Sequence, residues 1–330
     1  MDSQLPTPAD IRSEANAFQK SRIILTAFEL DIFTILEAKL LTSKEIAEKL
    51  NADERATDRL LNALCGIGYL VKSNGKFFNS EHAALYLVKG KPGYLGGLMH
   101  TVSLWDRWTT LTEVVKKGHA VYREAINDRG DDWLEAFIAA MNDRAKHQAK
   151  IIAMMLDLSN VNKTLDIGGG SGAFTFGFIH AKNDIHGTIF DLPNVIPITK
   201  KYVEAEKLTQ QIDYITGDYL ENDFGGPYDL ILLSAIVHIN SYDENKLLIK
   251  KCADVLNPGG QIAILDYVMS EDRTKPPDGA RFALNMLVGT TNGDTYTEKE
   301  MTEWMNNAGI TNVVKKETSF GSALMIGKKN

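Results

Sequence analysis

The stretch from Thr164 to Phe174, TLDIGGGSGAF, places four glycines directly behind a short apolar run. A glycine-rich turn between a strand and a helix brings a ligand against the backbone and the helix N-terminus. No Gly-Lys-Ser/Thr follows the glycines, so the pattern is not a P-loop. Gly168 and Gly170, together with Ala173, formally satisfy the dinucleotide pattern Gly-x-Gly-x-x-Gly/Ala. The glycines alone therefore leave the ligand open.

An acid lies just before this loop. Asp166 ends the expected strand, two residues ahead of the first glycine. A carboxylate at this point would repel a pyrophosphate and attract a cation. S-adenosylmethionine (SAM) fits, because it carries an ammonium and a positively charged sulfur. The alternative is that Asp166 only caps the following turn.

Two further acids follow the next two expected strands. Asp191 closes the strand in TIFDLP, roughly 20 residues on, where an acid can accept hydrogen bonds from ribose hydroxyls. Asp218 follows the strand in ITGDYL and is placed to meet the adenine edge. Each acid alone is typical of a turn, but open α/β sheets bind ligands at the carboxyl ends of their strands. We therefore predict cofactor contacts from these acids, from their neighbours Leu192 and Tyr219, and from Ser234.

The elements needed to position these residues follow from the pattern after residue 160. Short β-branched runs alternate with helical segments, which predicts a mostly parallel, Rossmann-like sheet with helices on both faces. Thr297 and Glu300 have capping-box spacing and mark the start of a late helix. Two final strands that meet near Gly321, with almost no connection, predict an antiparallel hairpin at the end of the sheet. The expected strands are KTLDIG, HGTIFD, QIDYIT, YDLILLS and QIAILDYVM, and the helices between them are 173–180, 195–206 and 243–256.

The chain before residue 100 has the order of a winged-helix unit. SRIILTAFELDIFTIL predicts an apolar helix, and Thr42 with Glu45 marks the start of the next helix. ERATDRLLNALCGIGYL repeats apolar residues at helical spacing as far as Gly66. YLVKSNGKFFNS predicts a hairpin that turns at Asn74 and Gly75.

The middle of the chain predicts two long helices, one around 104–115 and one around 133–156. We therefore expect three parts. Residues 1–100 form a winged-helix-like domain, residues 101–158 form linking helices, and residues 159–330 form the ligand-binding domain.

The composition is that of an ordinary soluble protein, and we expect a reducing, cytoplasmic location. The 330 residues are 44% hydrophobic and carry a net charge of −7, which argues against nucleic acid or an anionic membrane as the main partner. The two cysteines form no disulfide or metal framework, so no metal is expected. The polar start MDSQLPTPAD is no signal peptide, and no apolar run reaches the ~18 residues of a membrane helix.

Taken in order, several segments together resemble one family. They are LDIGGGSGAF, FDLPNVI, GDYL, LILLSAIVHI, LNPGGQIAILDYVM and YTEKEMTEWMNNAGI. The chain resembles the SAM-dependent O-methyltransferases of the caffeate and acetylserotonin type over nearly its whole length. The resemblance implies methyl transfer to an oxygen of a small, usually phenolic, molecule. It also implies a homodimer formed through the N-terminal domain.

The resemblance assigns the catalytic base to His238, which lies just past the carboxyl end of the fourth strand. A neutral imidazole, with a reference pKa of ~6.5, can take the proton of a phenol of pKa ~10 as the phenol attacks. Asp266 occupies the place of the carboxylate that orients this imidazole, where family members more often carry Glu. Two departures stand out. Ile239 and Asn240 replace the usual Asp and Trp after the histidine, and Thr295 stands where many plant members have a second Glu.

Acceptor contacts are also implied by the resemblance. Trp133, Phe137 and Met141 recur at i, i+4 and i+8 on one helix face, which on spacing alone is typical of ordinary core. In the family this face packs on the acceptor ring. Met286 matches a methionine that flanks the acceptor, and Asn285 beside it could donate a hydrogen bond.

Three other functions are also compatible with the sequence. The altered residues leave room for a SAM-binding relative with other chemistry or none. The loose glycine match allows an NAD- or FAD-dependent oxidoreductase. The winged-helix order allows a DNA-binding regulator, but residues 1–100 hold 12 Lys/Arg against 12 Asp/Glu, and phosphate binding needs a basic face.

Overall fold

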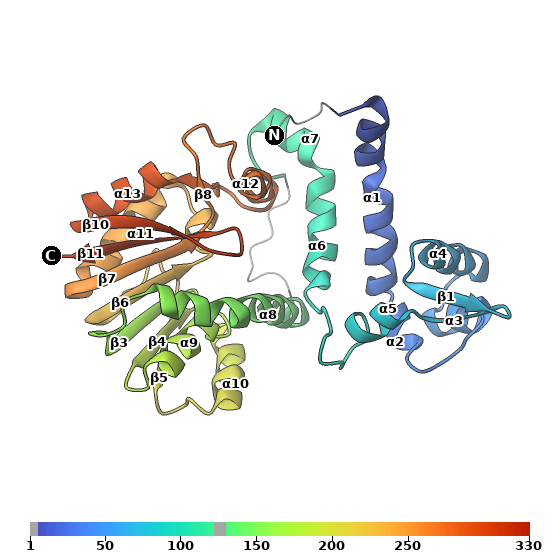
Figure 1. The fold of residues 1–330 in the computed structure, drawn as a ribbon, viewed down its shortest axis with the longest axis horizontal. Coiled ribbons are helices and arrows are strands. Elements are labelled where there is room, and N and C mark those ends of the chain that lie inside the picture. Colours follow the sequence, from blue (N-terminus) through green and yellow to red (C-terminus); the bar gives the residue numbers. More distant parts are fainter. Residues whose placement is uncertain (1–5, 122–129) are drawn as a thin grey trace. The chain divides into compact units, whose positions relative to one another are not determined.

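The computed structural model describes residues 6–121 and 130–330. The chain divides into two compact units, Met1–Trp105 and Asp106–Asn330, which Figure 1 colours along the sequence from blue to red. The linking segment expected at 101–158 is thus divided between the two units, and its long helix belongs to the second.

The first unit begins with α1 (Pro8–Glu29), which is followed by α2 (Ile32–Ile35). The single helix expected for SRIILTAFELDIFTIL is therefore wrong, because the chain leaves the helix after Glu29. Asp31 lies between the two helices with φ 55°, in the left-handed region that does not continue a helix. The polar first half of α1 was not expected, although Thr7 and Asp10 form a capping box at its start.

The rest of the first unit has the expected winged-helix order. It contains α3 (Ser43–Leu50), α4 (Glu54–Gly66), β1 (Leu70–Ser73), β2 (Lys76–Asn79) and α5 (Glu81–Tyr86). The Glu45 backbone N–H donates to Thr42 Oγ1 (3.3 Å), and the Thr42 N–H donates back to Glu45 Oε2 (2.7 Å), so the capping box is confirmed. The hairpin also turns where expected, with φ 49° at Asn74 and 74° at Gly75.

The single helix expected around 104–115 is two helices, α6 (Leu98–Thr109) and α7 (Leu111–Lys117). Two consecutive threonine hydroxyls turn back onto the preceding backbone at the break. Thr109 Oγ1 donates to the carbonyl of Asp106, and Thr110 Oγ1 donates to that of Arg107, each at 2.6 Å. Such local side-chain bonds compete with the helical pattern, which explains the interruption.

A seven-stranded sheet forms the centre of the second unit within the described residues, in the order β10-β11-β7-β6-β3-β4-β5. The five strands from β3 to β7 pair in parallel, and β10 and β11 are antiparallel at one edge, as expected. The last two strands are joined by residues 318–322, a longer connection than the sequence suggested. The strands are β3 (Lys163–Ile167), β4 (His186–Asp191), β5 (Ile212–Thr216), β6 (Tyr228–Ser234), β7 (Leu256–Asp266), β10 (Ile310–Glu317) and β11 (Ala323–Lys329).

Helices cover both faces of this sheet (Figure 1). Successive residues of β6 alternate between two apolar clusters. Leu230 and Leu232 pack with side chains of α8, α9 and α10, whereas Ile231 and Leu233 pack with those of α11 and α13. The bounds of these helices are α8 (Asp131–Met155), α9 (Ala173–Ala181), α10 (Ile196–Glu206), α11 (Tyr242–Asp254) and α13 (Glu298–Asn307). The second unit also contains the short 3₁₀ turn η2 (Val237–Ile239), α12 (Pro277–Gly289) and a small pair of strands, β8 (Val268–Met269) and β9 (Tyr296–Thr297).

The strand order reverses at β3, because β4 and β5 lie on one side of it and β6 and β7 on the other. The crevice beyond the carboxyl ends of such strands is where open α/β sheets bind ligands. The glycine loop follows β3 directly. None of the helices in the described residues is both long and apolar enough to cross a membrane.

Candidate active site

The glycine loop joins β3 to α9 and presents bare backbone. The backbone φ is +66° at Gly168, +57° at Gly170 and +85° at Gly172, in the left-handed region that glycine adopts without steric cost. A Cβ at Gly168 would also collide with the side chain of Ile236. Gly168 and Gly170 both line a cavity of about 320 Å³ in the second unit, so a ligand there can approach the peptide backbone closely.

Asp166 lies beneath this loop and is 1% exposed. Its Oδ2 accepts a hydrogen bond from Thr175 Oγ1 (2.9 Å), whereas its buried Oδ1 has no partner among the described residues. Burial raises the pKa of Asp166 to about 7, and the nearby Asp191 acts in the same direction. A buried, unpartnered carboxylate oxygen beside a cavity suits a cationic hydrogen-bond donor better than it suits a phosphate.

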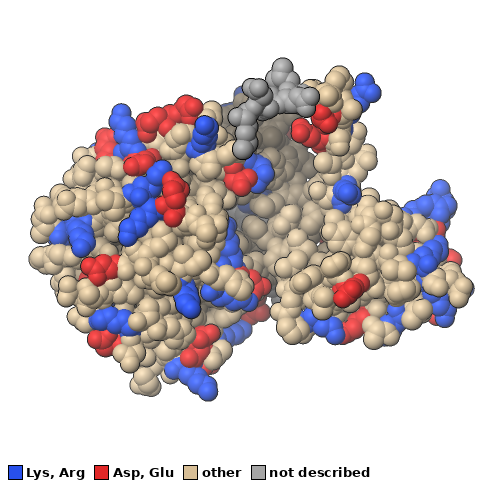
Figure 2. Space-filling view, viewed as in Figure 1, with Lys and Arg blue, Asp and Glu red and all other residues tan. Residues whose placement is uncertain are grey.

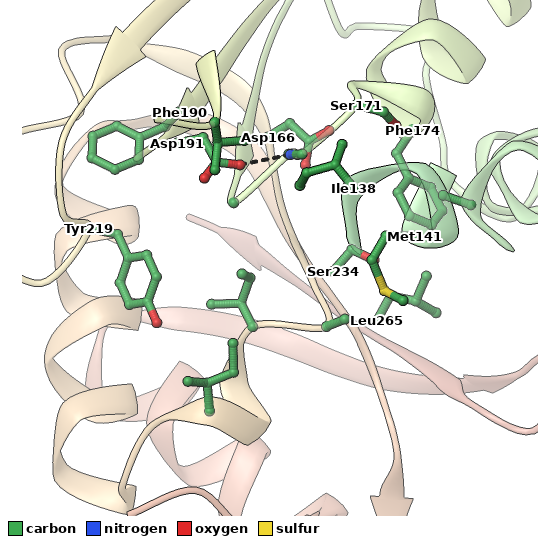
Figure 3. Close-up of a pocket in the computed structure, with 18 of the residues that line it drawn as sticks. Ile138, Met141, Asp166, Ser171, Phe174, Phe190, Asp191, Tyr219, Ser234 and Leu265 are labelled. Atoms are coloured by element: carbon green, nitrogen blue, oxygen red, sulfur yellow. Dashed lines mark hydrogen bonds between the residues drawn. The ribbon is translucent and has the colours of Figure 1, made fainter. Parts of the chain in front are cut away.

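Asp191, at the end of β4, holds the glycine loop from the neighbouring strand. Its Oδ2 accepts from the Gly170 N–H and its Oδ1 from the Leu192 N–H, both at 2.8 Å, and Figure 3 shows the first bond as a dashed line. Burial raises the pKa of Asp191 to about 6, although these two bonds favour its charged form. The sequence suggested only a cofactor contact here. The structure adds a second task, because the same carboxylate fixes the loop.

The other expected cofactor residues lie around the same cavity. Asp218 is exposed at its rim, and its Oδ1 accepts from the Leu220 N–H (2.8 Å). Leu192 also lines the cavity. Figure 3 shows the ring of Tyr219 on one side, across from Ser234 at the end of β6. The structure thus brings the predicted cofactor residues together, and their contacts with SAM stay a prediction.

His238 and Asp266 form a buried pair in the lining of the same cavity, 9% and 5% exposed. His238 Nδ1 lies 2.9 Å from Asp266 Oδ1 and 2.8 Å from Oδ2. The Tyr267 N–H donates to Asp266 Oδ1 (2.8 Å), which fixes the carboxylate in turn. An ionised carboxylate can only accept a hydrogen bond, so the Nδ1 proton faces it, and in the neutral imidazole the lone pair is left on Nε2.

The residues expected to bind the acceptor are only partly brought together. Phe137 and Met141 line the cavity, whereas Trp133, Asn285 and Met286 do not. Trp133 lies one turn before Phe137 and stacks on its ring, with centroids 5.1 Å apart, so the shared face of α8 extends beyond the cavity. A role in acceptor binding stays a prediction for these residues.

The amide oxygen of Asn285 accepts a hydrogen bond from a residue outside the cavity lining. Trp108 on α6 donates from Nε1 to Asn285 Oδ1 (3.0 Å). This bond links α6 to α12 and uses the amide oxygen of the residue expected to contact the acceptor.

Sequence reasoning missed three lining residues that bear on the chemistry. Arg144 on α8 lines the cavity, and its place seven residues after Phe137 puts it on the same helix face, so a signal existed. Tyr267 and Phe282 also line it, with rings 5.0 Å apart. Phe282 meets the ring of His238 edge-on at 4.8 Å. These two come from separate elements, so nothing in their spacing points to the site.

The charged lining is mostly acidic. Asp166, Asp191, Asp218 and Asp266 line the cavity with Arg144 as the cationic side chain among the described lining residues. Outside the cavity, Figure 2 shows blue and red side chains interspersed on the face drawn. The carboxylates that line the cavity favour a cationic ligand.

Family models agree with this arrangement. The model described as O-methyltransferase domain matches residues 108–311, which is more than half of the chain. The model described as O-methyltransferase dimerisation domain matches residues 13–89. The chain therefore belongs to the O-methyltransferase family, and the family resemblance of its motifs is confirmed. It is a SAM-dependent O-methyltransferase with an N-terminal helical dimerisation domain and a Rossmann-like domain.

Individual relatives cover almost the whole chain. It is 30% identical over 312 residues to 3-hydroxy-5-methyl-1-naphthoate 3-O-methyltransferase of Streptomyces sahachiroi, and the matched region covers 93% of this chain and 90% of the relative. It is 28% identical over 352 residues to acetylserotonin O-methyltransferase of Gallus gallus, which covers 100% of both. The solved structure of PigF with SAH is similar with a TM-score of 0.86 at 25% identity, over 98% of this chain and 100% of that one.

Proposed function

We propose that this enzyme transfers the methyl group of SAM to a hydroxyl of a small aromatic molecule, with His238 as the general base. The observation that carries the proposal is the buried His238–Asp266 pair. It lines the same cavity as Asp166, Asp191 and the glycine loop.

The cavity fits the charges of SAM. The cationic end of SAM suits the unpartnered Oδ1 of Asp166 and the backbone of the glycine loop. Arg144 suits its carboxylate, and the ring of Tyr219 offers an apolar wall for its base. When bound, SAM supplies a methyl group on a positively charged sulfur, which leaves as a neutral thioether.

The histidine then has one task. Asp266 holds the Nδ1 proton and leaves the lone pair on Nε2. As the acceptor oxygen bonds to the methyl carbon, Nε2 takes the hydroxyl proton, and the electron pair of the breaking carbon–sulfur bond goes to sulfur. Asp266 stabilises the imidazolium that forms. A positioned base of this kind contributes about 10²–10⁴-fold in rate.

The acceptor class follows from the apolar part of the cavity lining. Phe137, Met141, Tyr267 and Phe282 offer apolar and aromatic surface, which suits a flat ring. Relatives that act, by their names, on a hydroxynaphthoate and on acetylserotonin support the same class.

A homodimer is part of this proposal. The first unit matches a dimerisation domain, and α1 exposes two large apolar side chains, Ile11 (55%) and Phe18 (53%). Exposed apolar side chains on one helix suit a protein interface.

The test begins with calorimetry of SAM binding. It continues with transfer of a labelled methyl group to hydroxynaphthoates, N-acetylserotonin and simple phenols. His238→Ala and Asp266→Asn should each lower kcat by about 100-fold or more, the second because the wrong imidazole tautomer is stabilised. His186→Ala is the matched control, because His186 pairs with Asp213 (3.0 Å) on the surface and should be dispensable. Full turnover by His238→Ala, or no binding of SAM, would contradict the proposal.

A further inference from the structure

A continuous chain of side-chain hydrogen bonds runs from the cavity wall to the turn that carries His238. Tyr219 Oη donates to Asn240 Oδ1 (2.9 Å), and Asn240 Nδ2 donates to Asn245 Oδ1 (3.0 Å). Asn245 Nδ2 then donates to the carbonyl of Val237 (2.7 Å), the residue before His238. We call Tyr219, Asn240 and Asn245 the relay residues.

The amide members of the chain are deeply buried, with Asn240 4% and Asn245 0% exposed. Burial raises the pKa of Tyr219 to about 12, so its hydroxyl stays a donor at neutral pH. A buried amide that loses its partner costs about 1–3 kcal/mol, whereas an apolar side chain of similar size would carry no such cost. What the buried amides add is therefore a defined geometry more than stability.

The turn itself is fixed through three of its carbonyls. Besides the bond from Asn245 to Val237, the Asp294 N–H donates to the His238 carbonyl (3.0 Å), and Tyr296 Oη donates to the Asn240 carbonyl (2.6 Å). These bonds set the backbone of His238, as Asp266 sets its ring.

The other end of the chain is fixed as well. Lys251 Nζ, from α11, donates to the carbonyls of Tyr219 (2.7 Å) and Asn222 (2.9 Å). Tyr219 is thus held at its backbone and at its hydroxyl by one stretch of chain, residues 240–251. Hydrogen bonds therefore connect the cavity wall at Tyr219 to the turn that carries His238.

We propose that the relay residues are positioning residues that hold the imidazole of His238 in register with the donor-binding wall at Tyr219. The inference rests on the proposed function, in which His238 is the base. It gives a role to Asn240, one of the two positions that depart from the His-Asp-Trp pattern the resemblance led us to expect. A base displaced by about 1 Å can lose up to 10²-fold in rate, so a small loss of register is measurable.

The experiment compares Tyr219→Phe, Asn240→Leu and the double variant, with Tyr228→Phe as the matched control. Tyr228 has a buried hydroxyl that donates to the Phe224 carbonyl (2.7 Å), and within the described part of the chain it makes no hydrogen bond to the His238 turn. Three quantities are measured: the Kd for SAM, kcat and KM in methyl transfer to the best aromatic of the screen, and the ¹³Cε1 resonance of His238, assigned from its absence in His238→Ala.

Tyr219→Phe should lower kcat about five- to tenfold while the Kd for SAM changes less than about twofold, because the ring remains. Asn240→Leu should lower kcat by about tenfold or more, and the double variant should be no worse, because the chain is already broken. The His238 resonance should move in all three. Tyr228→Phe should leave kcat and the resonance unchanged.

The inference is overturned if the two losses simply multiply, if the resonance stays in place, or if the control loses as much activity. Should Asn240→Leu not fold, Tyr219→Phe and the resonance still decide. The resonance needs no acceptor, so it separates this inference from the proposed function. If His238→Ala is inactive while the relay variants are normal, only the relay fails. If His238→Ala still methylates the acceptor, the proposed function fails instead, because His238 is then not the base.

Discussion

Replacing Asp166 by Asn tests whether the buried carboxylate binds the cationic donor. In the free protein, burial raises the pKa of Asp166 to about 7 and that of Asp191 to about 6. A cationic ligand prefers the ionised carboxylate. At a pH below these pKa values, binding must therefore be accompanied by loss of the carboxyl proton. SAM should therefore bind more tightly as the pH rises towards 7.

The size of the effect follows from the two pKa values. At pH 5.5 a group of pKa about 7 is about 3% ionised, and at pH 7 about half, a change of about fifteenfold. The same interval changes the ionised fraction of Asp191 only about fourfold. The wild-type Kd should thus fall by at least about fifteenfold between pH 5.5 and 7, and that of Asp166→Asn by only about fourfold.

Calorimetry at several pH values, in buffers of different ionisation enthalpy, measures both the Kd and the protons released. The range stops at pH 7 because the amino group of SAM titrates near ~8. Asp213→Asn, an exposed aspartate outside the cavity, serves as the control and should keep the wild-type pH dependence. An identical Kd at pH 5.5 and 7 in the wild type would refute the electrostatic reasoning.

Stability without SAM gives an independent check with a defined sign. A carboxyl whose pKa is raised on folding contributes stability below about pH 4, and this is lost as the pH rises to 7. Over about three pKa units the loss is about 4 kcal/mol, and a buried amide N–H without a partner costs about 1–3 kcal/mol. Asp166→Asn should therefore be about 1–3 kcal/mol more stable than the wild type at pH 8, by urea unfolding. A less stable variant at that pH would count against the buried charge.

Three further predictions concern the loop, the histidine turn and the interface. Asp191→Ala should weaken SAM binding and also lower the free energy of unfolding by about 1–3 kcal/mol, because two backbone N–H groups lose their acceptor. Calorimetry measures the binding and thermal melts measure the stability, and an unchanged melting temperature would show that Asp191 does not stabilise the loop. Gly293→Ala should lower kcat about tenfold or more at unchanged SAM affinity, since a Cβ there would collide with the carbonyl of His238; normal kcat would show that the turn tolerates the shift. The protein should scatter light as a dimer at micromolar concentration and Phe18→Asp should weaken that dimer, whereas a monomeric wild type would contradict the interface on α1.

The elements that local signals specify were predictable. The capping boxes at Thr42 and Thr297 and the turn at Asn74 and Gly75 lie where the sequence places them, because each needs only residues within four positions of one another. The break after Glu29 was not predictable in this way, since apolar residues continue on both sides of it. Phe28 and Ile32 are buried on the two sides of the break, so the apolar pattern alone does not mark where the helix ends.

The sequence by itself determined the alternation of strands and helices, the glycine loop and the acids that follow the strands. It did so because hydrophobic period and turn chemistry act over a few residues. Only the tertiary structure decided that Asp191 fastens Gly170 and that His238 meets Asp266. These contacts join residues 21 and 28 positions apart, and they depend on which strands lie side by side in the sheet. Strand order is a property of the whole packed core, so no local pattern records it.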